Sequence, residues 1–112
     1  MESTELEKYR HDLAFLRMMA DQTIKDFDRF SYDLQFNEQL PVNFNNYVEQ
    51  LCDFIKVCCK TDSNRLSSLL YGIDVPEHLL PPRSGCADPK RTAEVILQRE
   101  LIKVVMRKLY TG

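Results

Sequence analysis

Apolar side chains recur at steps of three and four residues in three long runs, the pattern of one face of an α-helix. The most apolar run lies within Asn43–Lys60, where Phe44, Val48, Leu51 and Ile55 share one face. The charged positions of this run form only a narrow outward strip. A helix that is apolar over most of its circumference is expected in the middle of a bundle, so we predict that Leu51 and Ile55 are almost fully buried.

A second apolar run extends from Leu6 to Leu34 at three-four spacing, with no Gly or Pro inside it. Such a seam predicts one continuous helix of about thirty residues. Pro41 interrupts the connection that follows, and Asn43 is a favoured residue type for the N-cap of the next helix.

The third long run opens at Asp88-Pro89, residue types preferred just before and at the first position of a helix. It predicts a helix that continues to about Tyr110. A shorter helical pattern precedes it and is expected to end near Gly72 as a C-terminal cap. One more helical turn is expected to begin at Pro76.

No segment shows a sustained alternation of apolar and polar residues, so no β-sheet is predicted. A length of 112 residues fits one domain, residues 1–112. The predicted fold is therefore all-α: a compact bundle of four main helices plus one short helical turn.

The formal net charge of −2 is small, but the charges are unevenly distributed. Residues 1–56 carry 6 basic and 11 acidic side chains, whereas residues 57–112 carry 9 basic and 6 acidic ones. We expect the two halves to face each other within one bundle. The first residues resemble no signal peptide and no run is long enough to span a membrane, so a cytoplasmic location is expected.

Four cysteines are present, and the cytoplasm keeps thiols reduced. Cys52, Cys58 and Cys59 fall on the apolar Asn43–Lys60 helix and are interpreted as small hydrophobic core residues. Cys86 follows a Pro- and Gly-rich stretch and is expected to be an exposed, reactive thiol in a loop.

The motifs of common catalytic and metal sites are missing from the sequence. It contains no Cys-x2-4-Cys knuckle for zinc and no Glu-x-x-His for a di-metal carboxylate site. It also lacks Gly-x-Ser-x-Gly and a Gly-rich phosphate loop. The two histidines, His11 and His78, each follow an acidic residue by four positions, which favours helix-surface pairs over metal ligands. We expect no enzymatic activity, no cofactor and no metal.

Arg99, Lys103 and Arg107 recur at steps of four along the last helix and form a basic strip. A strip of this kind suits phosphate groups, which makes nucleic-acid binding the alternative function. The negative overall charge and the need of any long helix for a solvated face favour an ordinary surface strip.

The last helix also carries two apolar flanks, more than one small bundle readily buries. We therefore predict a non-enzymatic protein–protein interaction or structural module that self-associates as a homodimer. The candidate contact residues are Val95, Ile102 and Met106. Another protein is the alternative partner; no membrane and no small-molecule substrate are indicated.

Two blocks in the second half of the chain resemble small, uncharacterised, all-helical bacterial proteins: Arg65-Leu66-x-x-Leu69-Leu70-Tyr71-x-Ile73-Asp74 and Ala93-Glu94-x-Ile96-x-x-Arg99-Glu100. The resemblance implies a bacterial cytoplasmic protein and carries no particular activity.

Overall fold

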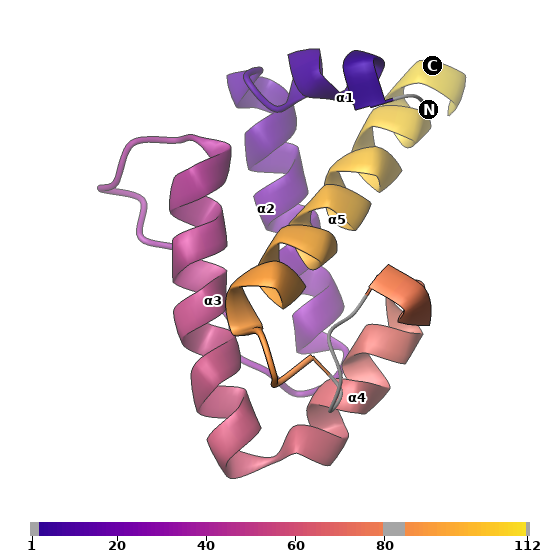
Figure 1. Cartoon of the computed structure of the whole chain (residues 1–112). Coiled ribbons are helices and arrows are strands. Elements are labelled where there is room, and N and C mark those ends of the chain that lie inside the picture. Colours follow the sequence, from indigo (N-terminus) through magenta and orange to yellow (C-terminus); the bar gives the residue numbers. More distant parts are fainter. Residues whose placement is uncertain (1–2, 80–84, 112) are drawn as a thin grey trace.

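The protein is built from α-helices (Figure 1). The computed structural model describes residues 3–79 and 85–111, and within those ranges it contains no β-strand. The elements in order are α1 (Ser3–Tyr9), α2 (Leu13–Asp28), α3 (Phe44–Thr61), α4 (Ser63–Gly72), a 3-10 turn η1 (Glu77–Leu79) and α5 (Pro89–Thr111). The predicted all-α class is confirmed.

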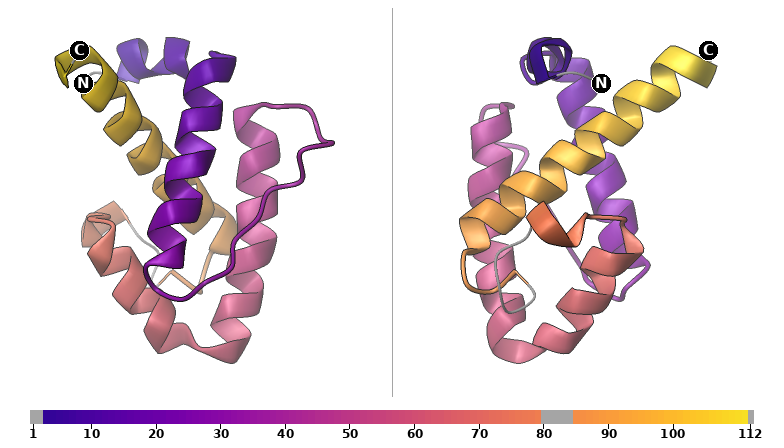
Figure 2. Two further views of the ribbon diagram at one scale, coloured as in Figure 1. Left: turned by 180° about the vertical axis from the view of Figure 1, so that it is seen from behind. Right: turned by 45° about the vertical axis from the view of Figure 1, so that its right-hand side comes forward.

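Helix α5, and not α3, occupies the centre of the structure. It crosses α2 and α3 diagonally, and both of these helices make their main packing contacts with it (Figures 1 and 2). Its 23 residues extend for about 35 Å at the usual helical rise, close to the longest dimension of the molecule, 38 Å. Six of its apolar side chains are at most 2% exposed: Ala93, Ile96, Leu97, Leu101, Val104 and Val105.

The helix predicted from Leu6 to Leu34 is interrupted, and that prediction is wrong. Asp12 adopts an extended backbone conformation and caps α2, its carboxylate accepting hydrogen bonds from the amides of Ala14 (2.9 Å) and Phe15 (3.2 Å). An aspartate that satisfies the first amides of a new helix favours a break over continuation. Helix α1 therefore turns away from α2 across the end of the molecule (Figure 1).

The same predicted helix also ends early, at Asp28. Ser31 has a φ of +64°, a left-handed conformation that turns the chain out of the helix. Tyr32 and Leu34 are nevertheless buried, because the chain after Ser31 runs back along the core in an irregular conformation (Figure 2). The apolar residues after Asp28 thus keep helical spacing in the sequence, although the backbone there is not helical.

The predicted starts of the two later long helices are confirmed. Asn43 caps α3 by accepting a hydrogen bond from the amide of Asn46 at 2.8 Å. Asp88 accepts one from the amide of Arg91 at 3.1 Å, immediately before Pro89 opens α5. Leu51 and Ile55 are fully buried, as predicted.

Gly72 closes α4 as its last residue but is not a left-handed cap. The residue with positive φ is Asp74, at +66°. Gly72 faces the ring of Phe30, and a Cβ there would lie only 2.9 Å from Phe30 Cε2. The glycine therefore leaves room for the Phe30 ring, which would have to shift if this residue carried a Cβ.

The cysteines are not all reduced. Cys59 on α3 and Cys86 before α5 form a disulfide between residues 27 apart in sequence, which corrects the predictions of a core thiol and an exposed reactive thiol. Cys52 and Cys58 are free and buried, and burial raises the pKa of each thiol. Positions 81–84, in the loop predicted before Cys86, lie outside the described residues.

None of the described helices is both long and apolar enough to cross a lipid bilayer.

Candidate functional site

The predicted basic strip of α5 is engaged with acidic and polar groups of the same chain. Arg99 Nη2 lies 3.1 Å from Asp74 Oδ2. Lys103 Nζ lies 3.0 Å from Asp26 Oδ2, and Arg107 Nη1 donates to Gln22 Oε1 at 3.0 Å. Lys103 thus pairs with an acidic residue of the first half, as Lys90 does with Glu49 at 3.2 Å, whereas Arg99 pairs with Asp74 of its own half and Gln22 is uncharged.

Lys103 belongs to a buried ionic cluster between α2 and α5. Its ammonium group bridges Asp26 and Glu100, the second at 2.7 Å from Oε1. Asp26 also accepts hydrogen bonds from Gln22 (2.9 Å) and Arg29 (3.1 Å). Asp26 is 4% exposed and Glu100 is completely buried, so both carboxyl groups depend on these few partners.

The two carboxyl groups of the cluster have opposite pKa shifts. Burial raises the pKa of Glu100 to about 7, with a further rise from the neighbouring Asp26, and Lys103 opposes the shift only in part. Burial acts in the same direction on Asp26, but its interactions with Glu100, Lys103 and Gln22 outweigh burial and lower its pKa. Near neutral pH, the cluster therefore holds an ionised Asp26 beside a Glu100 that is poised to exchange a proton.

The three candidate interaction residues do not form one exposed flank. Val95 is 5% exposed and belongs to the core, Ile102 is half-buried and Met106 is 38% exposed. Val95 and Ile102 line a hollow of about 170 Å³ together with Pro76 and Leu79. The turn around η1 therefore covers the part of the flank nearest Val95.

The exposed apolar side chains of α5 gather at its C-terminal end. Met106, Leu109 and Tyr110 are 38%, 51% and 76% exposed. Their spacing of three and four residues places them on one side of the helix. This distal end of α5, defined here by those three residues, extends past the body formed by α3 and α4 (Figure 2).

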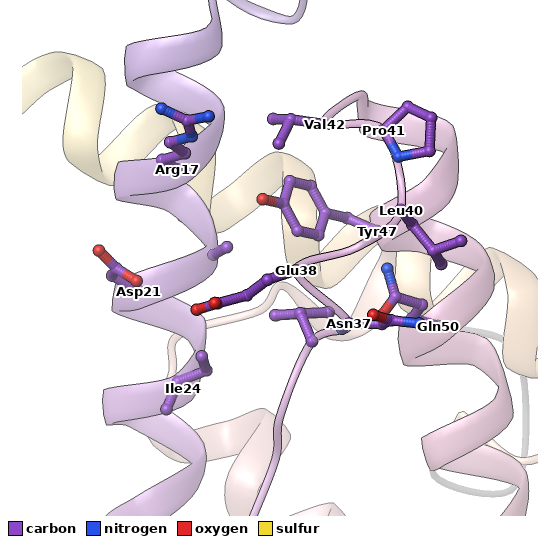
Figure 3. A pocket seen from close by; sticks show the side chains of 12 residues that line it. Arg17, Asp21, Ile24, Asn37, Glu38, Leu40, Pro41, Val42, Tyr47 and Gln50 are labelled. Atoms are coloured by element: carbon purple, nitrogen blue, oxygen red, sulfur yellow. The ribbon is translucent and has the colours of Figure 1, made fainter.

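A cavity of about 480 Å³ opens between α2, the segment 36–42 and the start of α3 (Figure 3). It exists because α2 and α3 both pack on α5 and not closely on each other. The volume falls within the range of small-molecule sites, which is roughly 300–1,000 Å³.

The outer wall of this cavity is tied firmly to α3. The amide of Asn37 donates to Gln50 Oε1 at 2.6 Å, and Asn46 Nδ2 donates to the carbonyl of Pro41 at 2.8 Å. The ring of Phe36 meets that of Tyr47 edge-to-face, with centroids 4.9 Å apart. The wall is thus preformed even though the segment has no regular secondary structure.

The hydroxyl group of Tyr47 points into the cavity (Figure 3). The residue is only 8% exposed, but its hydroxyl oxygen is not one of the buried side-chain atoms that lack a hydrogen-bond partner in the described residues, because it faces the accessible space of the cavity. Burial raises the pKa of this hydroxyl; Arg17 acts in the opposite direction, and Asp21 and Glu38 add to the rise. Three charged side chains therefore lie around a hydroxyl group that faces the cavity.

Sequence reasoning did not identify the cavity or the two carboxyl groups of the cluster. Glu100 carried a usable signal, because it lies between Leu97, Leu101 and Val104 on an apolar helix face. The cavity carried none, since its outer wall is an irregular segment without periodicity.

Comparisons with protein-family models, with curated proteins and with solved structures give no match to this chain. The resemblance to small bacterial helical proteins therefore stays a prediction, and any function must be argued from the side chains themselves.

Proposed function

We propose that this protein is a non-enzymatic helical module that acts by binding protein, and that its first partner is a second copy of itself. The contact surface is the distal end of α5. The observation that carries the proposal is the grouped exposure of Met106, Leu109 and Tyr110 on one side of that helix.

Apolar side chains grouped on one surface favour association because contact removes them from water. Each Å² of apolar surface removed contributes about 25 cal/mol, from which the entropic cost of association is subtracted. Two helix ends packed about a two-fold axis place the same apolar residues against each other, and this is the commonest closed arrangement. The small area involved favours a dimer that forms in the micromolar range over an obligate one.

Nucleic-acid binding is not proposed. Its three candidate residues, Arg99, Lys103 and Arg107, interact with Asp74, Asp26 and Gln22 of the same chain. A phosphate backbone would have to compete with these internal partners.

The cytoplasmic location expected from the sequence stays a prediction. The Cys59–Cys86 disulfide weighs against it, because the cytosol keeps most thiols reduced. The absence of enzymatic activity likewise remains part of the proposal.

The test compares two charge substitutions at similarly exposed apolar positions. Leu109→Glu introduces a carboxylate at the distal end of α5, where Leu109 is 51% exposed, and should shift the protein to the monomer in sedimentation experiments. Val57→Glu introduces the same charge in the C-terminal part of α3, where Val57 is 60% exposed, and should leave the dimer unchanged. Circular dichroism of both variants confirms that each is folded. Equal behaviour of the two variants would contradict the assigned surface.

A further inference from the structure

We propose that the cavity between α2, the segment 36–42 and α3 binds a small zwitterion with an apolar side chain, of the chemical class of a free aliphatic α-amino acid. This site is separate from the distal end of α5, so the proposal stands or falls independently of self-association.

The interior of the cavity suits an aliphatic group. Ala20 and Ile24 line it from α2, and Phe36 and Val42 line it from the facing segment. Such a surface contributes to binding by removing an apolar side chain from water, but it does not orient the ligand.

The charges at the rim supply the orientation. Arg17 and Asp21 lie one turn apart on α2, and Glu38 extends toward them from the opposite wall (Figure 3). None of the three takes part in an ion pair with a residue that the structure describes. A guanidinium group beside two carboxylates matches a ligand that carries one carboxylate and one ammonium group.

Tyr47 places a polar group inside the cavity. Its hydroxyl group faces the cavity from an otherwise buried side chain (Figure 3), where it can donate a hydrogen bond to a ligand or accept one from it. Its position is fixed by the edge-to-face contact with Phe36 at 4.9 Å between centroids. It can therefore hydrogen-bond to either charged end of the ligand without rearranging.

The ligand assignment follows from the combination of these features. A simple cation would meet Arg17, and a simple anion would meet Asp21 and Glu38, so each would face a like charge. A zwitterion satisfies both signs. The preformed wall means that little conformational entropy is lost on binding.

The test is a calorimetric titration of the full chain with three molecules that share one aliphatic group. L-Leucine carries both charges, isopentylamine lacks the carboxylate and isocaproate lacks the ammonium group. Leucine should bind at least about tenfold more tightly than either analogue, since each analogue loses a charge-assisted contact. Equal or tighter binding of either analogue, or no saturable heat with leucine, would overturn the proposal.

Three variants locate the site. Tyr47→Phe should weaken leucine binding about three- to tenfold through loss of one hydrogen bond. Arg17→Gln and Asp21→Asn should each weaken it about threefold, since exposed charges contribute less. Asp53→Asn, which removes an exposed carboxylate from α3 away from the cavity, is the matched control and should bind leucine unchanged. Unaltered affinity in Tyr47→Phe would place the binding elsewhere and refute the assignment.

Discussion

Lys103 Nζ lies 3.0 Å from Asp26 Oδ2, and this ion pair links the central helix α5 to α2 across 77 positions of sequence. Glu100 lies on the other side of the same ammonium group. The cluster lies where the main helices cross, so its protonation and pairing are directly coupled to the stability of the fold.

Replacing Lys103 with Met should destabilise the protein by about 3 kcal/mol, because it leaves a buried carboxylate without its cation. The loss should be measured as the shift in free energy of unfolding in urea. Lys90→Met is the control, since Lys90 and Glu49 form an ion pair whose side chains are 60% and 61% exposed. It should unfold almost like the wild type. If Lys103→Met also unfolds almost like the wild type, the cluster does not contribute to the stability of the fold.

The stability of the wild type should fall as the pH rises from about 4.5 to about 7. Over this range the folded protein retains a proton on Glu100, whose pKa is raised from 4.5 to about 7, while the unfolded chain releases it. The folded state therefore binds more protons, and linkage gives a loss of about 3 kcal/mol across the window and little change above it. The pKa of Asp26 is lowered from its usual value of 3.8, so this residue changes the pH dependence of stability only below about pH 3.8, outside this window.

Glu100→Gln cannot ionise and should remove this pH dependence from urea unfolding curves. Glu94→Gln, at a half-buried position six residues earlier on the same helix, should keep it. A wild-type stability that stays flat between pH 5 and 7 would mean that Glu100 titrates at an ordinary pKa.

Gly72→Ala should destabilise the protein by about 1–2 kcal/mol through overpacking. In an unconstrained helix this change is favourable, because Ala is the better helix former. Here the new Cβ would meet the ring of Phe30, with Cε2 at 2.9 Å. Thermal melts should show that Gly72→Ala stabilises the protein when Phe30 is replaced by Ala. A stabilising effect in the wild-type background would show that Phe30 moves aside at no cost.

Reducing the Cys59–Cys86 disulfide should lower the free energy of unfolding by roughly 3 kcal/mol, because it frees the loop between the two residues in the unfolded chain. Cys86→Ser should show the same loss and no further response to reductant. Thiol labelling of the native oxidised protein should be slow, since both free cysteines are buried. Rapid labelling of four thiols without reductant would show that the disulfide does not form.

Local chemistry accounts for the parts of the fold that the sequence predicted well. Asn43 and Asp88 are strong N-caps. The starts of the helices they open are set by local hydrogen bonds to amides three residues later, which the sequence reveals directly. The break at Asp12 was missed because its neighbours keep helical spacing, while its own carboxylate caps a new helix. Phe30 beside Gly72 is a long-range contact that spacing along the chain cannot reveal.

The candidate sites were less predictable for the same reason. The uneven charge distribution predicted that the two halves face each other, yet it could not indicate that Lys103 would bind Asp26 of the first half while Arg99 binds Asp74 of its own half. The Cys59–Cys86 bond depends on where a loop returns to α3. Val95 carries helical apolar spacing like Met106, and only the position of the turn around η1 decides that one is buried and the other exposed.

The central claim, self-association through the distal end of α5, is tested most directly by the mass of the wild-type protein in solution. Light scattering over a concentration series, with the disulfide intact, should give a mass that rises from 13.2 kDa toward twice that value within the micromolar range. A mass that stays at 13.2 kDa at every concentration into the high micromolar range would contradict the claim, since Met106, Leu109 and Tyr110 would then remain exposed to water.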